Sequence, residues 1–443
     1  MFIILLNIDL GRGVTAMREH GRIRAALLCV CVVVVLCLTP VRAMAKPLTG
    51  ESLYFLTAAM SAASYSGEWQ EILREKLKRA GWDIASFATR TEKTYGRTFL
   101  YSKETTNGER IYLLAFPGTE CREDVRVDLR FARVPFGGDT PAESAVQAGS
   151  GDDGDNVPRV HKGFNDYVQA ALFTNPLTEG EHAGITLGEA IAEQLKKDPE
   201  GHLYVTGHSL GGAAAVLAAA RLADMGVHPD QLTVVTFGTP AVGDKAFAEA
   251  YVDRFRLERI EMRGDIMKAL LQSPLGYHRF GHKVEWKESK GNERFRHDMV
   301  LYLDAAIRRY YDSEHEQDIP ALLMREEKRR ERIYLAPIKP ELDENISEDE
   351  IYMQKLLRDY IETEYDVIDL PETDSAAKLT LPTLYIGVTA ERIRNERHSF
   401  RLTVERMFLA GDGSMISVSS RSDASADLTP METVLYLLGQ AER

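Results

Sequence analysis

The stretch Leu203-Tyr-Val-Thr-Gly-His-Ser-Leu-Gly-Gly-Ala213 decides the fold of this chain. Residues 203–206 have the apolar, aromatic and β-branched character of a buried strand, and the Ala-rich segment 213–222 favours a helix. Between them lies a G-x-S-x-G sequence, the pattern of a nucleophile elbow. In such an elbow a serine stands on a sharp turn with its hydroxyl exposed, next to the positive N-terminus of a helix. We therefore predict that Ser209 is a nucleophile held between a strand and a helix.

Strands and helices alternate along the chain around this elbow. A helix is predicted at 187–196 before it, and a strand, a helix and a strand at 232–237, 244–253 and 255–262 after it. This alternation predicts an α/β fold with a mostly parallel central sheet, whose chemistry lies at the carboxyl ends of the strands.

Further elements are predicted nearer the amino end. Helices at 51–64 and 70–79 are expected to cover one face of the sheet, and strands at 98–102 and 110–116 flank a Thr-Thr-Asn-Gly hairpin signal. The strict alternation of apolar and charged residues over 125–131 predicts another strand. The segment 137–158, rich in Gly, Asp, Ser and Ala, predicts a mobile acidic loop, and 160–164 and 164–172 predict a strand and a helix.

A serine hydroxyl needs a base to take its proton and an acid to hold the base in the right tautomer. In an α/β hydrolase these follow the serine in the order acid, then histidine. Asp265 stands at the end of a predicted strand, and His297 opens an amphipathic helix. We predict Ser209, Asp265 and His297 as the catalytic set. His278 and His282 remain as rival bases, with Asp244 and Asp253 as rival acids.

The oxyanion formed by attack on a carbonyl needs hydrogen-bond donors. By the geometry of an elbow, the backbone N–H of Leu210 is one of them. The turn Phe116-Pro-Gly-Thr119 follows a predicted strand, so Thr119 could supply a second donor through its N–H and its hydroxyl.

Six blocks of the sequence, in order, resemble the class 3 lipase family over residues 50–310: Leu114–Thr119, Val160–Phe164, Val205–Gly212, Thr236–Gly243, Gly264-Asp265 and His297–Tyr302. The resemblance implies an α/β hydrolase with no metal or cofactor that cleaves carboxylic esters of acylglycerols or related lipids. It also implies Ser209, Asp265 and His297 as the triad, with Thr119 and Leu210 as the oxyanion hole.

The chain departs from this family at the segment that would form the lid. Residues 120–124 are short and charged, which suggests a polar lid, and the segment 137–158 could act as a second cover. Pro117 stands where the family usually has Arg, and 266–269 replaces a loop that commonly contains proline. A lipase, a phospholipase and a soluble short-chain esterase or thioesterase therefore all remain open.

The first 45 residues have the pattern of a secretory signal peptide: arginines, an apolar run at 25–38, and Ala43-Met-Ala45 before the expected cut. The run is short for a bilayer span, so an uncleaved anchor is the less favoured alternative. The chain carries a net charge of −13, to which this segment contributes +3, so the rest carries −16. That acidity argues against nucleic acid as a partner. We predict a periplasmic or secreted protein, whose single remaining cysteine, Cys121, rules out an internal disulfide.

The predicted organisation is a signal peptide (1–45), a hydrolase domain (46–311), a charged helical linker (312–332) and a small α+β domain (333–443). The last domain faintly resembles the amino-terminal domain of periplasmic TolB, through Arg332–Pro337 and Val367–Leu370. That resemblance implies a contact with an envelope protein. It also supports an alternative from another class, a noncatalytic envelope scaffold that works through its C-terminal domain. The elements expected there are strands at 333–338, 365–369, 383–389, 400–409 and 415–420 and helices at 347–362 and 429–440.

Overall fold

The computed structural model describes residues 48–434, apart from 93, 105–109, 151–153, 155, 268–274, 288–294, 314–330, 372–378, 394–399, 426–428 and 432–433. The predicted signal peptide, the hairpin turn at 105–108 and most of the charged linker lie outside the described residues. Within the described part, no helix combines the length and apolar character that crossing a bilayer requires.

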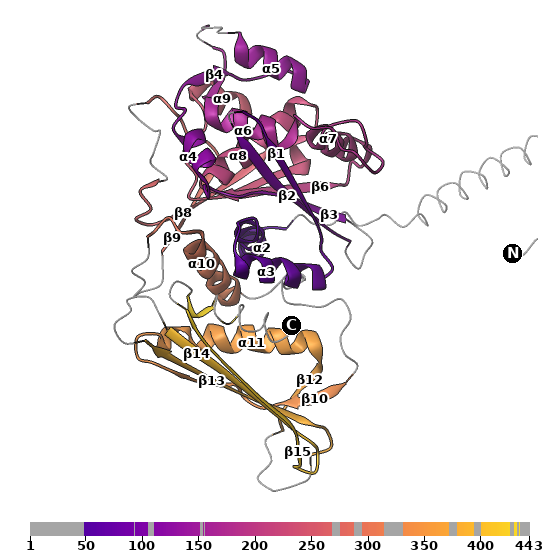
Figure 1. The fold of residues 1–443 in the computed structure, drawn as a ribbon, viewed down its shortest axis with the longest axis vertical. Coiled ribbons are helices and arrows are strands. Elements are labelled where there is room, and N and C mark those ends of the chain that lie inside the picture. The colour runs from indigo at the N-terminus through magenta and orange to yellow at the C-terminus, as the bar shows by residue number, and fades with distance from the viewer. Residues whose placement is uncertain are drawn as a thin grey trace, which may run out of the picture. The chain divides into compact units, whose positions relative to one another are not determined.

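A seven-stranded, mostly parallel sheet forms the centre of the amino-terminal half (Figure 1). The strand order is β1-β2-β3-β6-β7-β8-β9. The first two pairings are antiparallel, and the four from β3 to β9 are parallel. The strands are β1 (Asp83–Arg90), β2 (Tyr95–Glu104), β3 (Arg110–Phe116), β6 (His202–His208), β7 (Leu232–Phe237), β8 (Arg256–Met262) and β9 (His282–Trp286). The predicted α/β fold with a mostly parallel sheet is confirmed.

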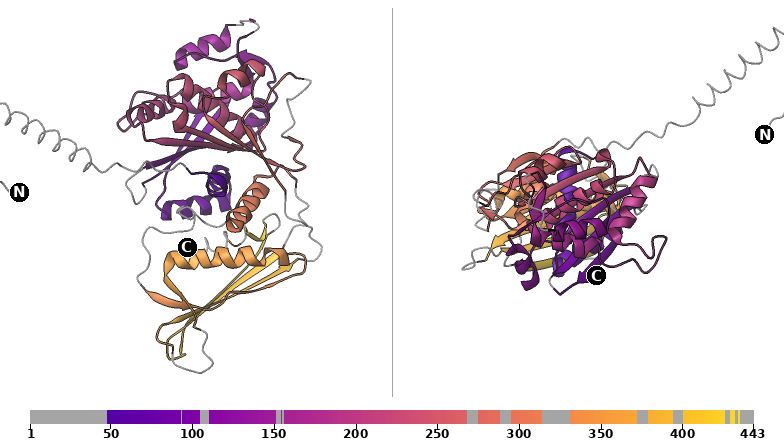
Figure 2. Two further views of the ribbon diagram at one scale, coloured as in Figure 1. Left: turned by 180° about the vertical axis from the view of Figure 1, so that it is seen from behind. Right: turned by 90° about the horizontal axis from the view of Figure 1, so that it is seen from above.

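Helices cover both faces of this sheet (Figures 1 and 2). On one face lie α2 (Gly50–Ala63), α3 (Glu68–Arg79) and α10 (Met299–Asp312). On the other lie α6 (Lys162–Leu172), α7 (Leu187–Lys197), α8 (Leu210–Asp224) and the short α9 (Lys245–Tyr251). The central helix α8 is buried along almost its whole length because alanines let it approach the strands closely. The two faces have separate buried hydrophobic clusters.

Two segments differ from their predictions. Residues 125–128, the first part of the stretch expected to be a strand, belong to the helix α4 (Arg122–Asp128), and about two fifths of the expected acidic loop forms α5 (Pro141–Gly149). In α4, the buried carboxylate of Asp124 accepts the N–H groups of Glu120 and Cys121, so it holds the helix start. In α5, the Thr140 hydroxyl accepts the Glu143 N–H, with proline in the first turn. A small sheet of β4 (Arg133–Pro135) and β5 (Arg159–His161) joins these segments.

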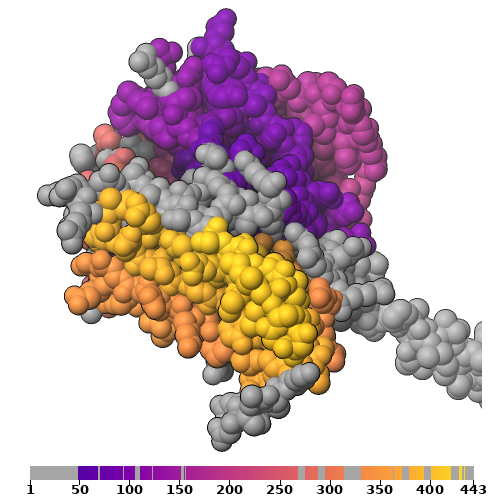
Figure 3. Space-filling view, turned by 60° about the horizontal axis from the view of Figure 1, so that its bottom comes forward, coloured from indigo at the N-terminus to yellow at the C-terminus, as the bar shows by residue number. Residues whose placement is uncertain are grey.

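A second sheet occupies the carboxyl-terminal part, with strand order β12-β10-β13-β14-β15 and β11 paired to β13. Its strands are β10 (Arg332–Leu335), β11 (Lys339–Leu342), β12 (Asp366–Asp369), β13 (Thr383–Arg392), β14 (Phe400–Leu409) and β15 (Met415–Ser425). The helix α11 (Glu350–Glu364) packs on one face. Strands β14 and β15 lie at the surface, in the yellow region of Figure 3.

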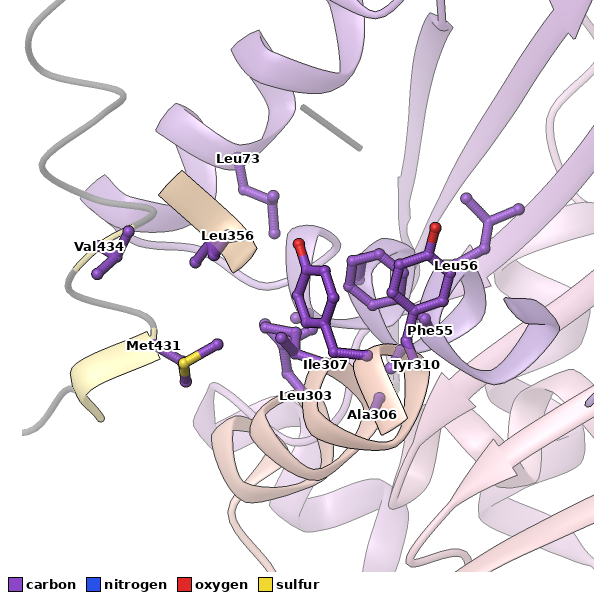
Figure 4. Packing of buried hydrophobic residues seen from close by; sticks show 14 of the residues in the cluster. Phe55, Leu56, Leu73, Leu303, Ala306, Ile307, Tyr310, Leu356, Met431 and Val434 are labelled. Carbon is purple, nitrogen blue, oxygen red and sulfur yellow. The ribbon is translucent and has the colours of Figure 1, made fainter. Parts of the chain in front are cut away.

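One buried cluster joins α10 to this second sheet (Figure 4). It contains Ile307 and Tyr310 of α10, Leu356 of α11 and Met431 near the carboxyl end. Polar contacts support it. The Arg308 guanidinium bonds the carboxylates of Asp304 and Asp349, and the Tyr311 hydroxyl donates to Asp359 across 2.6 Å. The helix that begins beside His297 is therefore packed from both sides.

Candidate active site

Ser209 lies on the turn between β6 and α8, as the elbow sequence predicts. Its φ of 55° makes it the one residue other than glycine with a positive φ in the described part of the chain. The surrounding backbone holds it there: the Ser209 N–H donates to the Phe237 carbonyl across 3.0 Å, and the Ala213 N–H donates to the Ser209 carbonyl across 3.1 Å. Strain retained in this way marks functional positions.

The elbow requires glycine at two positions. A Cβ on Gly207 would overlap the backbone of Gly211, and a Cβ on Gly211 would overlap the Phe116 carbonyl. The absence of side chains therefore lets the start of α8 approach β3 and β6 closely, so that the helix N-terminus lies beside the serine.

The three residues predicted as a triad come together. The Ser209 hydroxyl lies 2.7 Å from His297 Nε2, and His297 Nδ1 lies 2.9 Å from Asp265 Oδ2. Asp265 follows β8 and His297 lies two residues before α10, so the sheet and the helix set the spacing. With the proton on Nδ1 donated to Asp265, Nε2 is free to accept the serine proton. This arrangement is the geometry of an activated serine nucleophile.

Tyr302, which the sequence reasoning did not single out, completes the support of the acid. Its hydroxyl donates to Asp265 Oδ2 across 2.7 Å, and the Met267 N–H donates to Oδ1 across 2.9 Å. Burial alone would raise the pKa of Asp265, but the hydrogen bonds from His297 and Tyr302 outweigh it and lower the pKa below its ordinary value. Asp265 therefore stays ionised.

His208, next to the serine, is a neutral support. Its Nδ1 lies 2.6 Å from the Tyr65 hydroxyl, and its ring lies 4.5 Å from the His297 ring. Burial and the proximity of His297 lower the pKa of His208 to about 3. The ring therefore does not compete with His297 for the proton. Tyr65 was also missed from sequence, because an aromatic residue after a helix is indistinguishable from core.

The turn predicted to carry the oxyanion donors packs against the elbow. Phe116 pairs with Gly207 across β3 and β6, and a Cβ on Gly118 would overlap the Tyr65 hydroxyl and press on the His208 carbonyl. Thr119 follows directly, and its hydroxyl donates to Asp128 Oδ2 across 2.8 Å. The Leu210 N–H opens α8, where a helix has no internal acceptor. The oxyanion role of Thr119 and Leu210 stays a prediction.

Exposed apolar side chains follow the segment expected to form a polar lid. Within that segment, Asp124 is fully buried, and Arg97 bonds both Glu120 and Asp124. Beyond them, Val125, Leu129 and Phe131 are 47%, 61% and 48% exposed. The charges of residues 120–124 did not predict these neighbouring exposed apolar side chains, and the polar lid itself stays a prediction.

The rival acids and bases lie in other roles. The His282 ring bonds Glu258 across 2.6 Å, and His278 bridges the backbone of Gly243. Asp244 caps α9 by accepting the Phe247 N–H across 2.9 Å, and Asp253 is exposed. Among the described residues, no group of three or more His, Cys, Asp or Glu side chains could hold a metal ion.

Comparison with known proteins shows what this region is similar to. Residues 113–271 match the family model described as lipase (class 3). A phospholipase A1-II 4 from Oryza sativa subsp. japonica is 27% identical over 214 residues, 44% of this chain and 50% of that protein. A lipase from Rhizomucor miehei is 29% identical over 222 residues, 48% of this chain and 51% of that protein. The chain thus spans about half the length of these two relatives.

A solved structure of the Rhizomucor miehei triacylglyceride lipase aligns with a TM-score of 0.38 at 23% identity, over 54% of this chain and 82% of that one. The family model covers both the predicted oxyanion turn and the elbow, and it ends six residues beyond Asp265. Residues 113–271 of this chain are thus similar to the class 3 lipase family, as the six sequence blocks suggested.

Proposed function

We propose that this protein is a serine hydrolase that cleaves carboxylic esters of lipids through an acyl-enzyme. The observation that carries the proposal is the hydrogen-bonded chain from Ser209 through His297 to Asp265, at 2.7 and 2.9 Å. The family of the region and the names of its relatives, which are lipases and phospholipases, support a lipid ester as the substrate.

In the proposed acylation step, Ser209 Oγ attacks the ester carbonyl carbon while His297 Nε2 takes the hydroxyl proton. The carbonyl oxygen becomes an oxyanion, which the N–H groups of Leu210 and Thr119 stabilise. His297, held by the Asp265 carboxylate, then gives its proton to the departing alcohol oxygen as the carbon–oxygen bond breaks. Ser209 is left carrying the acyl group.

Deacylation repeats these roles with water. His297 takes a proton from a water molecule, whose oxygen attacks the acyl carbon. The second oxyanion collapses, and the proton on His297 returns to Ser209 Oγ as the fatty acid leaves. Over both steps, one water molecule is consumed: its hydroxyl goes to the acid and its other proton restores Ser209, while the original serine proton leaves with the alcohol.

A lipid substrate fits the apolar side chains around the site. Val125 on α4 and Leu129 directly after it are exposed, near Asp128, which bonds Thr119. Ile266, next to Asp265, is 68% exposed, and Phe295, whose ring lies 6.0 Å from that of His297, is 53% exposed. Large apolar side chains that are exposed to water around the catalytic residues favour contact with acyl chains or a lipid surface.

The test compares wild-type protein with Ser209→Ala on p-nitrophenyl esters of increasing chain length and on phospholipid and triglyceride emulsions. Ser150→Ala, at the exposed end of α5, is the matched control. We expect wild type and Ser150→Ala to turn over long-chain esters and to react with a fluorophosphonate probe, and Ser209→Ala to do neither. A folded wild type that is inert toward every ester and the probe would favour a noncatalytic scaffold. A preference for the shortest esters would favour a soluble esterase.

We also propose that the protein is exported, with residues 1–45 removed after Ala45, and that its carboxyl-terminal sheet contacts an envelope protein. The support is the arginine-rich, then apolar, then small-residue order of the first 45 residues and the faint TolB-like pattern. Amino-terminal sequencing of the protein recovered from its native cells tests the cleavage, and a start at Met1 or Met17 would contradict it.

A further inference from the structure

A cavity of about 310 Å³ lies between helix α7 and the strands β1, β2 and β3. The strands contribute Phe87, Leu100 and Tyr112 to its wall, and α7 contributes Leu187 and Ile191. The cavity is distinct from the catalytic site. One lining residue, Leu203, stands near the start of β6, six residues before Ser209. Since a strand rises about 3.3 Å per residue, roughly 20 Å separates the two along the strand.

The wall of this cavity is apolar but incompletely packed. Phe87, Leu100 and Tyr112 contact the buried cluster under α6, α7 and α8 and yet remain only partly buried. Leu177, in the loop before α7, also packs against this cluster and is only partly buried. Apolar surface left in a concave site is stabilised when another apolar group replaces the water there. The cavity therefore fits an apolar ligand better than it fits water.

The rim decides the kind of polar head that such a ligand carries. It is formed by Glu181, His182 and Gln194. The nearby basic side chains lie beside carboxylates: His182 Nδ1 lies 3.7 Å from Glu193, and Lys197 Nζ lies 3.7 Å from Glu181. An anionic head would meet Glu181 with no excess of positive charge to offset it. Hydroxyl groups, in contrast, can donate to the Glu181 carboxylate and the Gln194 carbonyl.

We propose that this cavity is a second lipid-binding site, which takes the single chain of a neutral glycerolipid such as a monoacylglycerol and holds its hydroxyls at the rim. A water-sized group occupies about 30 Å³ in the liquid, so the cavity has room for about ten methylene-sized groups. Binding here needs no reaction at Ser209, so this proposal can be tested independently of the hydrolase activity.

The test measures binding of 1-O-alkylglycerols to the Ser209→Ala protein by calorimetry below their micelle concentrations. These ethers contain no ester, so hydrolysis cannot contribute. We expect saturable binding whose affinity rises about fourfold for each added methylene, the effect of burying one more apolar group, and levels off near ten carbons. Decanoate should bind at least tenfold more weakly than 1-O-decylglycerol.

Variants distinguish binding in this cavity from binding near the catalytic residues. Ala190→Phe, on α7, fills the cavity and should weaken 1-O-decylglycerol binding at least tenfold. Ile266→Ser, next to Asp265, should leave this binding unchanged. Glu181→Gln should strengthen decanoate binding. If Ala190→Phe does not fold by circular dichroism, Ile191→Ala enlarges the cavity and should move the levelling-off to longer chains. Binding that survives in folded Ala190→Phe, or that shows no dependence on chain length, overturns the proposal.

Discussion

The hydroxyl of Thr119 donates its proton to Asp128 Oδ2 across 2.8 Å, so the side chain predicted to serve an oxyanion is already engaged. Because a hydroxyl has one proton, it cannot serve Asp128 and an oxyanion together. In the proposed mechanism, the N–H of Thr119 is then the donor left for the oxyanion, and the bond to Asp128 holds the turn that carries it.

Thr119→Val should therefore lower kcat by about 10- to 100-fold with little change in KM. The change removes the bond that orients the turn but keeps the N–H donor, so the loss should be smaller than the roughly 100- to 1000-fold that losing one oxyanion donor outright costs. Thr119→Ser keeps the hydroxyl and should retain most of the activity. Steady-state kinetics on a soluble ester would measure both, and an unchanged kcat in Thr119→Val would remove this turn from the mechanism.

Asp128 should make stability fall as pH rises. Burial, and secondarily Asp124, raises the pKa of Asp128 from 3.8 to about 6, against the hydrogen bond from Thr119. A carboxyl whose pKa is raised by folding contributes its stabilisation below pH 4, and this is lost as pH rises through 6. Asp128→Asn, which keeps an acceptor for Thr119, should therefore gain about 1–2 kcal/mol relative to wild type between pH 4 and 8. Urea unfolding at the two pH values measures it, and a gap that does not widen with pH would contradict it.

Tyr302→Phe should raise the pH at which the protein unfolds in acid. Asp265 has a lowered pKa, so its stabilisation is present above the unfolded value and is lost as pH falls through the folded value. Removing the Tyr302 hydrogen bond brings the folded pKa up toward the ordinary one. Circular dichroism during acid titration would measure the midpoint. Tyr334→Phe, whose hydroxyl bonds Thr380 in the second sheet, should leave it unchanged.

The packing of α11 against α10 should support the catalytic half. Leu356→Ala, at a position 1% exposed, should cost about 2–5 kcal/mol of unfolding free energy, as buried leucine truncations do. Ile351→Ala on the same helix, at a position 61% exposed, should cost under about 0.5 kcal/mol. Denaturant unfolding followed by the fluorophosphonate reactivity of Ser209 would show whether the site is lost in the same transition. A site that outlasts the unfolding of α11 would count against a shared core.

Gly211→Ala should prevent the elbow from forming, because its Cβ would overlap the backbone carbonyl of Phe116. Backbone cannot move aside as a flexible side chain can, so we expect a loss of at least about 3 kcal/mol or no soluble protein. Gly149→Ala at the end of α5, where a Cβ would meet nothing within 4 Å, is the control. Thermal melts compare the two, and a native-like melt for Gly211→Ala would show that the turn tolerates a side chain.

The central sheet and the Ser209, Asp265 and His297 arrangement could be predicted because each residue follows a local signal. The elbow has its glycines, Asp265 comes directly after a buried strand, and His297 precedes an amphipathic helix. Parallel strands then bring these ends to one edge of the sheet. In the carboxyl-terminal part, α11 and the strands β10, β12, β13, β14 and β15 were predicted from local patterns, but β11 was not.

The error at α4 has a physical cause. Apolar residues at 125, 127, 129 and 131 fit a strand period, but the residue that is buried is Val127, and its neighbours two positions away are exposed. The start of the helix is held by Asp124, which accepts the nearby N–H groups of Glu120 and Cys121 and is also bonded by Arg97 of β2. The contact with Arg97 lies outside any local pattern. Tyr65 and Tyr302 were missed for a related reason: their hydroxyl partners lie 143 and 37 residues away.

At Ser209, the backbone conformation that favours activity disfavours stability. A φ of 55° is a strained backbone conformation for a serine but not for a glycine, so holding Ser209 there lowers the free energy of unfolding. Ser209→Gly should therefore melt at a higher temperature than Ser209→Ala while lacking a nucleophile just as completely. Selection for thermal stability alone would therefore favour glycine at this position. The serine lowers stability, and its chemical role explains why it is present.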